Sequence, residues 1–75
     1  MLEKVIILEG LDCANCAAKV ERAASRIRGV DNANVTFMTR KLFMEVEDGK
    51  LEQVMKELDE VIHRIDSTVV LKVEK

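Results

Sequence analysis

The sequence of 75 residues has no Pro, no Trp and no Tyr, and it has only two Phe. Proteins that bind single-stranded nucleic acid stack the bases on aromatic side chains, and duplex binders carry an excess of Lys and Arg. Here 14 acidic residues outnumber 12 Lys and Arg, so the net charge is −2. The composition therefore argues against nucleic acid as a partner.

Long apolar segments are also absent. No apolar run exceeds four residues, whereas roughly 20 are needed to cross a bilayer, so we expect a soluble chain without direct membrane insertion. The two cysteines, Cys13 and Cys16, are too close in sequence for a disulfide between them to stabilise the fold much. No signal-peptide pattern precedes them, and we expect reduced thiols in the cytoplasm.

Apolar patterning predicts six elements. Alternating or β-branched residues predict strands over residues 3–9, 30–37, 41–47 and 68–74, and apolar spacings of three and four predict helices over 16–28 and 51–65. Asp12 or Asn15 is expected to cap the first helix. The order β-α-β-β-α-β and the right-handed crossover rule predict an α+β, ferredoxin-like fold, in which both helices cover one face of an antiparallel sheet. Residues 1–75 are expected to form a single domain.

Most side chains able to bind a metal ion are predicted to belong to the scaffold. Met38, Met44 and Met55 alternate with other apolar residues, so they are expected to pack in the core rather than bind copper. His63 is the only histidine, and we expect it at the surface of the second helix.

The distinctive chemistry lies in residues 10–16, Gly-Leu-Asp-Cys-Ala-Asn-Cys. Cys13 and Cys16 are expected at a loop-to-helix junction, where the helix N-terminus favours thiolates. Thiolates select Cu(I), Zn(II) and heavier ions over Mg(II) or Ca(II). Asp12 is either a helix cap or a third ligand. As a ligand, its carboxylate suits a divalent ion better than Cu(I), which two thiolates satisfy.

Two other functions are alternatives to metal binding. A dithiol-disulfide oxidoreductase would exchange the pair between thiol and disulfide, but such enzymes usually place an aromatic residue and a Pro at the motif, and this chain lacks Pro and Trp. A purely structural interaction module would not need the cysteines at all.

Together with the predicted element order, the segment Gly10-Leu11-Asp12-Cys13-Ala14-Asn15-Cys16-Ala17 resembles the metal-binding loop of heavy-metal-associated domains, usually Gly-Met-Thr-Cys-x-x-Cys. The resemblance covers nearly the whole chain and includes the segments 27–30 and 35–37. Members of this family are small cytosolic metallochaperones or N-terminal domains of P-type metal-transporting ATPases. With Asp before the first Cys, the motif resembles that of the family branch found in zinc-, cadmium- and lead-transporting ATPases. The segment 64–66 lacks the Lys or Tyr typical of copper chaperones.

The resemblance implies a metal-binding domain that is not itself an enzyme but is found as a part of P-type ATPases. Its implied ligands are Asp12, Cys13 and Cys16, and its implied cargo is Zn(II), Cd(II) or Pb(II). The implied partners are domains of a P-type ATPase or another metal-binding domain, on the cytosolic side of the membrane. Cu(I) chaperoning through the two cysteines alone is the alternative within the family.

The two predicted helices differ in charge. The first has four basic residues against Glu21, a net charge of +3, and the second has two basic against four acidic residues between 51 and 64, a net charge of −2. The basic residues of the first are Lys19, Arg22, Arg26 and Arg28. This polarity fits either the steering of a partner or two solvated faces.

Overall fold

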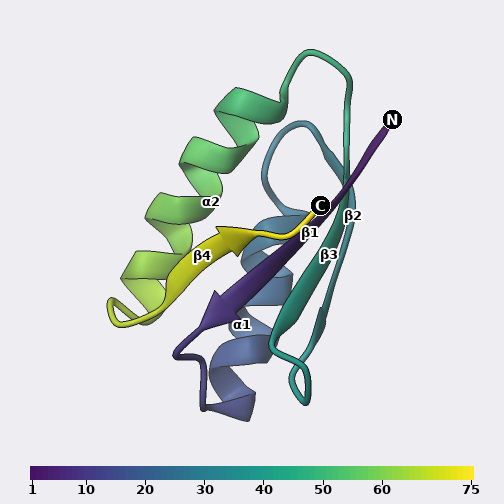
Figure 1. Cartoon of the computed structure of the whole chain (residues 1–75). Coiled ribbons are helices and arrows are strands. Elements are labelled where there is room, and N and C mark those ends of the chain that lie inside the picture. The colour runs from purple at the N-terminus through teal and green to yellow at the C-terminus, as the bar shows by residue number, and fades with distance from the viewer.

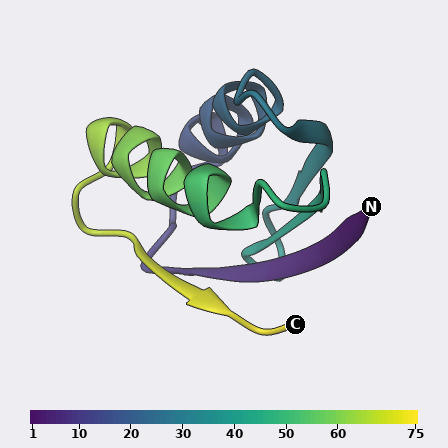
Figure 2. The same cartoon turned by 90° about the horizontal axis from the view of Figure 1, so that it is seen from above.

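A computed structural model describes all residues, 1–75, and contains the six expected elements in the expected order (Figure 1). They are β1 (Leu2–Glu9), α1 (Ala14–Ser25), β2 (Val30–Thr36), β3 (Lys41–Val46), α2 (Leu51–Ile65) and β4 (Val70–Val73). The strands form one antiparallel sheet in the order β2-β3-β1-β4. Both helices cover one face of this sheet (Figure 2). The predicted α+β, ferredoxin-like fold is confirmed.

The hydrophobic core lies between the sheet and the helices. In β3 the side chains of Leu42, Met44 and Val46 are buried while Phe43 is exposed, which confirms the predicted alternation. All 14 buried residues are hydrophobic, and no buried side-chain nitrogen or oxygen lacks a hydrogen-bond partner. No helix combines the length and the apolar character that a membrane crossing requires.

The methionines were predicted to lie in the core, and for Met38 this prediction is wrong. Met44 is buried and Met55 packs against the core, but the side chain of Met38 is 89% exposed. The cause is the end of β2 at Thr36. The residues after it form the β2–β3 turn, so the alternation of buried and exposed positions stops before it reaches Met38.

Three connections meet at one end of the molecule. Antiparallel pairing places Ile7 of β1 opposite Lys41, the first residue of β3, and Glu9 opposite Val70, the first residue of β4. The β1–α1 loop, the β2–β3 turn and the α2–β4 loop therefore lie at the same end (Figure 1). The backbone N–H of Leu8 also donates to the Arg40 carbonyl at 2.7 Å, which holds the turn against β1.

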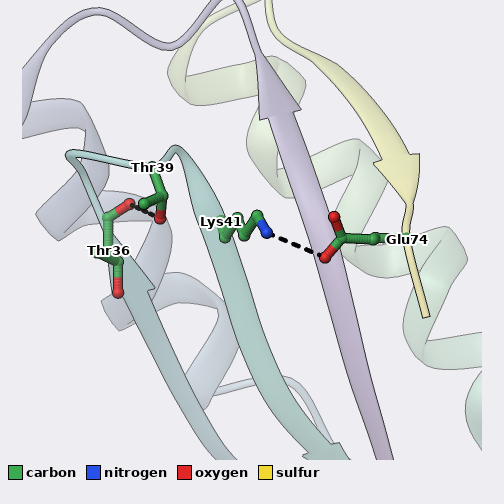
Figure 3. Close-up of polar contacts among 4 residues, drawn as sticks. All are labelled: Thr36, Thr39, Lys41 and Glu74. Atoms are coloured by element: carbon green, nitrogen blue, oxygen red, sulfur yellow. Dashed lines mark hydrogen bonds and ion pairs between the residues drawn. The ribbon is translucent and has the colours of Figure 1, made fainter.

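Figure 3 shows two polar contacts, one across the sheet and one within the β2–β3 turn. Lys41 Nζ lies 3.2 Å from Glu74 Oε2, and this ion pair joins β3 to the residue after β4 across β1. The hydroxyl of Thr39 donates to the Thr36 carbonyl at 3.4 Å within the β2–β3 turn. Exposed ion pairs contribute about 0–1 kcal/mol each, so this one adds little to the free energy of unfolding.

Gly10 is predicted to be required at the start of the β1–α1 loop. Its φ is +90°, and a Cβ there would lie 3.1 Å from the Thr68 carbonyl oxygen. Gly49 has a similar φ of +84° but free space around it. Gly49→Ala is expected to lower the free energy of unfolding by about 1–2 kcal/mol through left-handed strain alone. Gly10→Ala is expected to cost at least about 1 kcal/mol more, because of the added steric clash.

Urea denaturation of both variants without metal measures the difference. Equal losses would show that the approach of Gly10 to Thr68 does not constrain the loop.

Candidate metal site

Cys13 and Cys16 lie where the β1–α1 loop enters α1. Leu11 is fully buried and fixes the loop to the core. Cys13 has extended backbone angles, with φ −124° and ψ 119°, and its sulfur accepts a hydrogen bond from the Cys16 backbone N–H at 3.3 Å. Cys13 is thus the N-cap of α1.

The prediction that Asp12 or Asn15 caps α1 is therefore wrong. Because α1 begins at Ala14, two residues earlier than predicted, Asn15 already lies within the helix and Asp12 lies one position before the cap. A sulfur takes the place of the usual oxygen acceptor at the cap. Of the two roles considered for Asp12, capping is excluded. The helix also ends earlier than predicted, at Ser25, before the turn that contains Gly29 with φ +102°.

Both cysteines are reduced and half-buried. Cys16 packs against the hydrophobic core, while the remaining surface of the pair is open to solvent. Cys16 is therefore held against the core, while both residues keep part of their surface accessible to an incoming ligand.

The two thiols differ in acidity. A hydrogen bond from the Cys16 thiol, together with the one from its backbone N–H, lowers the pKa of Cys13. The same thiol–thiol hydrogen bond is the largest cause that raises the pKa of Cys16, followed by burial and the negative charge of Cys13. The negative charge of Asp66 raises this pKa by a smaller amount, while Lys19 acts in the opposite direction. Cys13 is thus the thiol that ionises first.

Asp12 lies beside the thiols without being tied to them. Its side chain is exposed and takes part in none of the side-chain hydrogen bonds or ion pairs of the chain. Its negative charge nevertheless acts to raise the pKa of Cys13. No three His, Cys, Asp or Glu side chains are gathered as a ready set of ligands. The structure thus brings the sulfurs of Cys13 and Cys16 together and leaves the Asp12 carboxylate free to move. That Asp12, Cys13 and Cys16 together bind a metal ion remains a prediction.

Asp66 is a charged neighbour of the site that the sequence analysis missed. Its Oδ1 accepts hydrogen bonds from the Thr68 hydroxyl at 2.6 Å and the Thr68 N–H at 3.0 Å, which lower the pKa of Asp66. The sequence contained one usable signal. In the predicted topology, the residues before the last strand lie beside those that follow the first strand, at the cysteine loop.

His63 is exposed, as predicted. Its Nε2 lies 3.0 Å from the Val69 carbonyl oxygen, and its Nδ1 lies 3.4 Å from Asp59 Oδ1. The ring thus connects α2 to the residue before β4.

Comparison with known families gives a match to the heavy-metal-associated domain over residues 5–68. The chain belongs to the heavy-metal-associated domain family. Among its relatives is the cadmium, zinc and cobalt-transporting ATPase of Bacillus subtilis (strain 168), 33% identical over 73 residues, which cover 96% of this chain and 10% of the relative. The copper chaperone CopZ of Staphylococcus epidermidis is 34% identical over 51 residues, which cover 68% of this chain and 75% of that protein.

Solved structures of heavy-metal-associated domains superpose along nearly the whole chain. The N-terminal domain of ZntA in its Zn(II) form is 29% identical, with a TM-score of 0.71, and the match covers 97% of this chain and 92% of that one. The chain spans only a tenth or less of the length of the first ATPase relatives. It is therefore a heavy-metal-binding domain related both to N-terminal domains of zinc, cadmium and lead ATPases and to metallochaperones, as the sequence predicted.

The first prediction from the site concerns the order in which the thiols ionise. Iodoacetamide labelling between about pH 6 and pH 10, with the modified residue located by mass spectrometry, is expected to show a lower pKa for Cys13 than for Cys16. Cys16→Ala is expected to raise the pKa of Cys13, because a hydrogen-bond donor is lost. Asn15→Ala, which keeps the backbone donors, serves as the control. Labelling of Cys16 at a lower pH than Cys13 would contradict the assigned hydrogen bonds between the two residues.

The second prediction tests the influence of Asp66. Asp66→Asn is expected to lower the pKa of Cys16, since a negative charge beside the thiolate is removed. Asp31→Asn removes an exposed carboxylate that is not among the charges acting on Cys16, so it is expected to leave that pKa unchanged. The same labelling experiment measures both. An equal shift of the Cys16 pKa in the two variants would mean that this pKa responds only to the net charge of the chain.

Proposed function

We propose that residues 1–75 form one domain that binds Zn(II), Cd(II) or Pb(II) through Asp12, Cys13 and Cys16, on the cytosolic side of the membrane. In this proposal the domain itself catalyses no reaction. It passes the ion to the membrane part of a P-type metal-transporting ATPase, or regulates such a pump. The observation that carries the proposal is the unattached Asp12 carboxylate beside two half-exposed thiols, in a chain whose relatives include transporters of these ions.

The charge at the site supports a divalent cargo. Two thiolates and the Asp12 carboxylate supply three negative charges, and the carboxylate of Asp66 adds a fourth near Cys16. A monovalent ion would leave most of this charge uncompensated, whereas a divalent ion attracts it more strongly. Lys19 is the cation whose charge acts on Cys16, and it offsets only part of the total.

The openness of the site supports transfer of the ion rather than storage. Two sulfurs satisfy a linear ion but leave a tetrahedral one with vacant positions. Asp12 can fill one of these positions and leave it again, since no hydrogen bond or ion pair holds its side chain. A partner's ligand can then bind the ion before Cys13 or Cys16 releases it, so the ion need not pass through a free state.

Cu(I) remains the second candidate cargo, because similarity extends to the copper chaperone CopZ and to a probable copper-importing ATPase of Enterococcus hirae. Cu(I) would use Cys13 and Cys16 alone. A dithiol-disulfide oxidoreductase is the candidate from another class, and it would turn over a disulfide substrate in the absence of metal.

Removing Asp12 distinguishes these candidates. Asp12→Ala is expected to weaken Cd(II) and Zn(II) binding at least about tenfold, because an oxygen ligand is lost. Cu(I) binding is expected to stay the same or to strengthen slightly, since the variant also removes a charge that raises the pKa of Cys13. Competition with chelators of known affinity gives the dissociation constants, and native mass spectrometry gives the stoichiometry.

Asp31→Ala is the matched control, because it removes an exposed carboxylate away from the loop. Cys13→Ser/Cys16→Ser is expected to abolish binding of every ion. Unchanged Cd(II) and Zn(II) affinity in Asp12→Ala, with Cu(I) as the only tightly held ion, would refute the divalent assignment. Disulfide reduction by the metal-free domain would instead favour the oxidoreductase.

A further inference from the structure

The helices leave one face of the sheet uncovered (Figure 2), and the one hollow of the molecule lies on this face. Its volume is about 250 Å³, below the roughly 300–1,000 Å³ typical of pockets for small-molecule ligands. The hollow therefore has room for a single side chain rather than for a cofactor. Eight residues line it: Glu3, Lys4, Val5, Asn32, Asn34, Phe43, Met44 and Glu45. We call it the sheet hollow.

The strand register arranges six of these residues in two rows that cross β1, β3 and β2. The first row is Glu3, Glu45 and Asn32, and the second is Val5, Phe43 and Asn34. Because side chains alternate between the faces of a sheet, both rows point away from the helices, opposite to the buried side chains of β3. Lys4 and Met44 occupy the alternate positions, whose side chains are directed to the helix side.

Two carboxylates meet at the hollow without a cation between them. Glu3 and Glu45 are directly opposite each other in the antiparallel pair of β1 and β3, a position in which like charges destabilise a sheet. Neither takes part in a side-chain hydrogen bond or an ion pair, although Glu45 is half-buried. A cation between the two carboxylates would replace this repulsion with attraction.

No cation of the chain supplies that charge. The other charged side chains that alternation places on the uncovered face form ion pairs. Lys41 Nζ lies 3.2 Å from Glu74 Oε2, and Lys72 Nζ lies 2.7 Å from Glu9 Oε2. The uncompensated negative charge of this face is therefore concentrated at the sheet hollow.

An aromatic ring and two amides favour arginine as the source of the missing cation. Phe43, in the row next to the carboxylates, is 41% exposed. A guanidinium stacks on an aromatic ring and donates parallel hydrogen bonds to a carboxylate, whereas an ammonium is a compact point charge. The side chains of Asn32 and Asn34 are exposed and make no hydrogen bond within the chain, so they offer further polar contacts.

The hollow also lies beside an open strand edge. The register of β4 with β1 ends at Val73 opposite Ile6, and Val5 is the last residue on this side whose carbonyl accepts a backbone bond, from the Glu74 N–H at 2.8 Å and the Lys75 N–H at 3.3 Å. Every second residue of an antiparallel strand directs its backbone groups to the same neighbour, so those of Glu3 face the open side. An extended polypeptide can pair with such an edge, which a free polyamine cannot do.

We propose that the sheet hollow binds an arginine side chain of a partner protein, whose extended segment lies along the open edge of β1 at Glu3. This inference goes beyond the proposed function, because it involves neither cysteine. The cysteine loop begins after Glu9, six residues further along β1, or about 20 Å away. A partner anchored at the hollow would therefore leave the candidate metal site accessible.

Two other occupants fit the hollow less well. A second copy of this chain that paired through the same edge would bring a second Glu3 to a site that already has excess negative charge. A hard divalent cation requires six or more oxygen ligands, and no three carboxylate, thiol or imidazole side chains are gathered anywhere in the molecule.

The test titrates the metal-free, isotope-labelled domain with short peptides and follows its backbone amide signals by NMR. The peptides alternate Thr and Ser, are blocked at both ends and differ only in the central residue, which is Arg, Lys or citrulline. Citrulline has the shape of arginine without its charge. The Arg peptide is expected to shift the signals of Glu3, Val5 and Phe43 and to bind roughly tenfold more tightly than the citrulline peptide at low salt. The Lys peptide is expected to bind with intermediate affinity.

Glu3→Gln/Glu45→Gln is expected to remove the difference between the Arg and citrulline peptides. Because this variant also removes the repulsion between two opposite carboxylates, it is expected to resist urea at least as well as the wild type. Glu52→Gln/Glu60→Gln is the matched control, since it removes two exposed carboxylates of α2 that form no ion pair, and it is expected to keep the preference. Phe43→Leu is expected to weaken binding of the Arg peptide about two- to fivefold.

Equal binding of the Arg and citrulline peptides by the wild type would refute the proposal, and so would an undiminished preference for Arg in Glu3→Gln/Glu45→Gln. Spermidine that binds as tightly as the Arg peptide, or CaCl₂ that displaces this peptide at constant ionic strength, would overturn the assignment to a protein side chain. Cys13→Ser/Cys16→Ser is expected to bind the Arg peptide like the wild type. Failure of metal binding and failure of peptide binding are therefore separate results.

Discussion

The antiparallel pairing of β1 with both β3 and β4 is the constraint on which the candidate site depends. The registers Ile7 opposite Lys41 and Glu9 opposite Val70 bring the cysteine loop, the β2–β3 turn and the α2–β4 loop to one end of the sheet. A shift by one residue would turn the buried face of β1 outward. The hydrophobic core thus fixes the site indirectly, because burial of Ile6 and Leu8 decides where the loop after β1 begins.

The Cys13 sulfur has two roles that support each other. As the N-cap of α1 it accepts the Cys16 backbone N–H, and the hydrogen bonds that hold it also favour its ionised form, in which it can bind a metal ion. A thiolate is a better acceptor than a thiol, so ionisation strengthens the cap. Binding of a cation at this sulfur and the start of the helix are therefore coupled through one atom.

Much of this arrangement could be predicted from the sequence, because its signals are local. The helix over 51–65 and the alternation in residues 41–47 follow from apolar spacing, and the family follows from the loop motif and the element order. Three features could not be predicted from local signals: the cap at Cys13, the position of Asp66 and the exposure of Met38. Each depends on where an element begins or ends or on which segments meet in space, and local apolar spacing determines neither.

The contact between Glu21 and Val35 has a further consequence for the sheet. β2 is an edge strand, paired only with β3, so its outward N–H groups could accept a strand from another molecule. The Glu21 carboxylate occupies the N–H of Val35 and places a negative charge along that edge. α1 therefore removes one backbone donor from this edge, which disfavours the addition of a foreign strand at Val35.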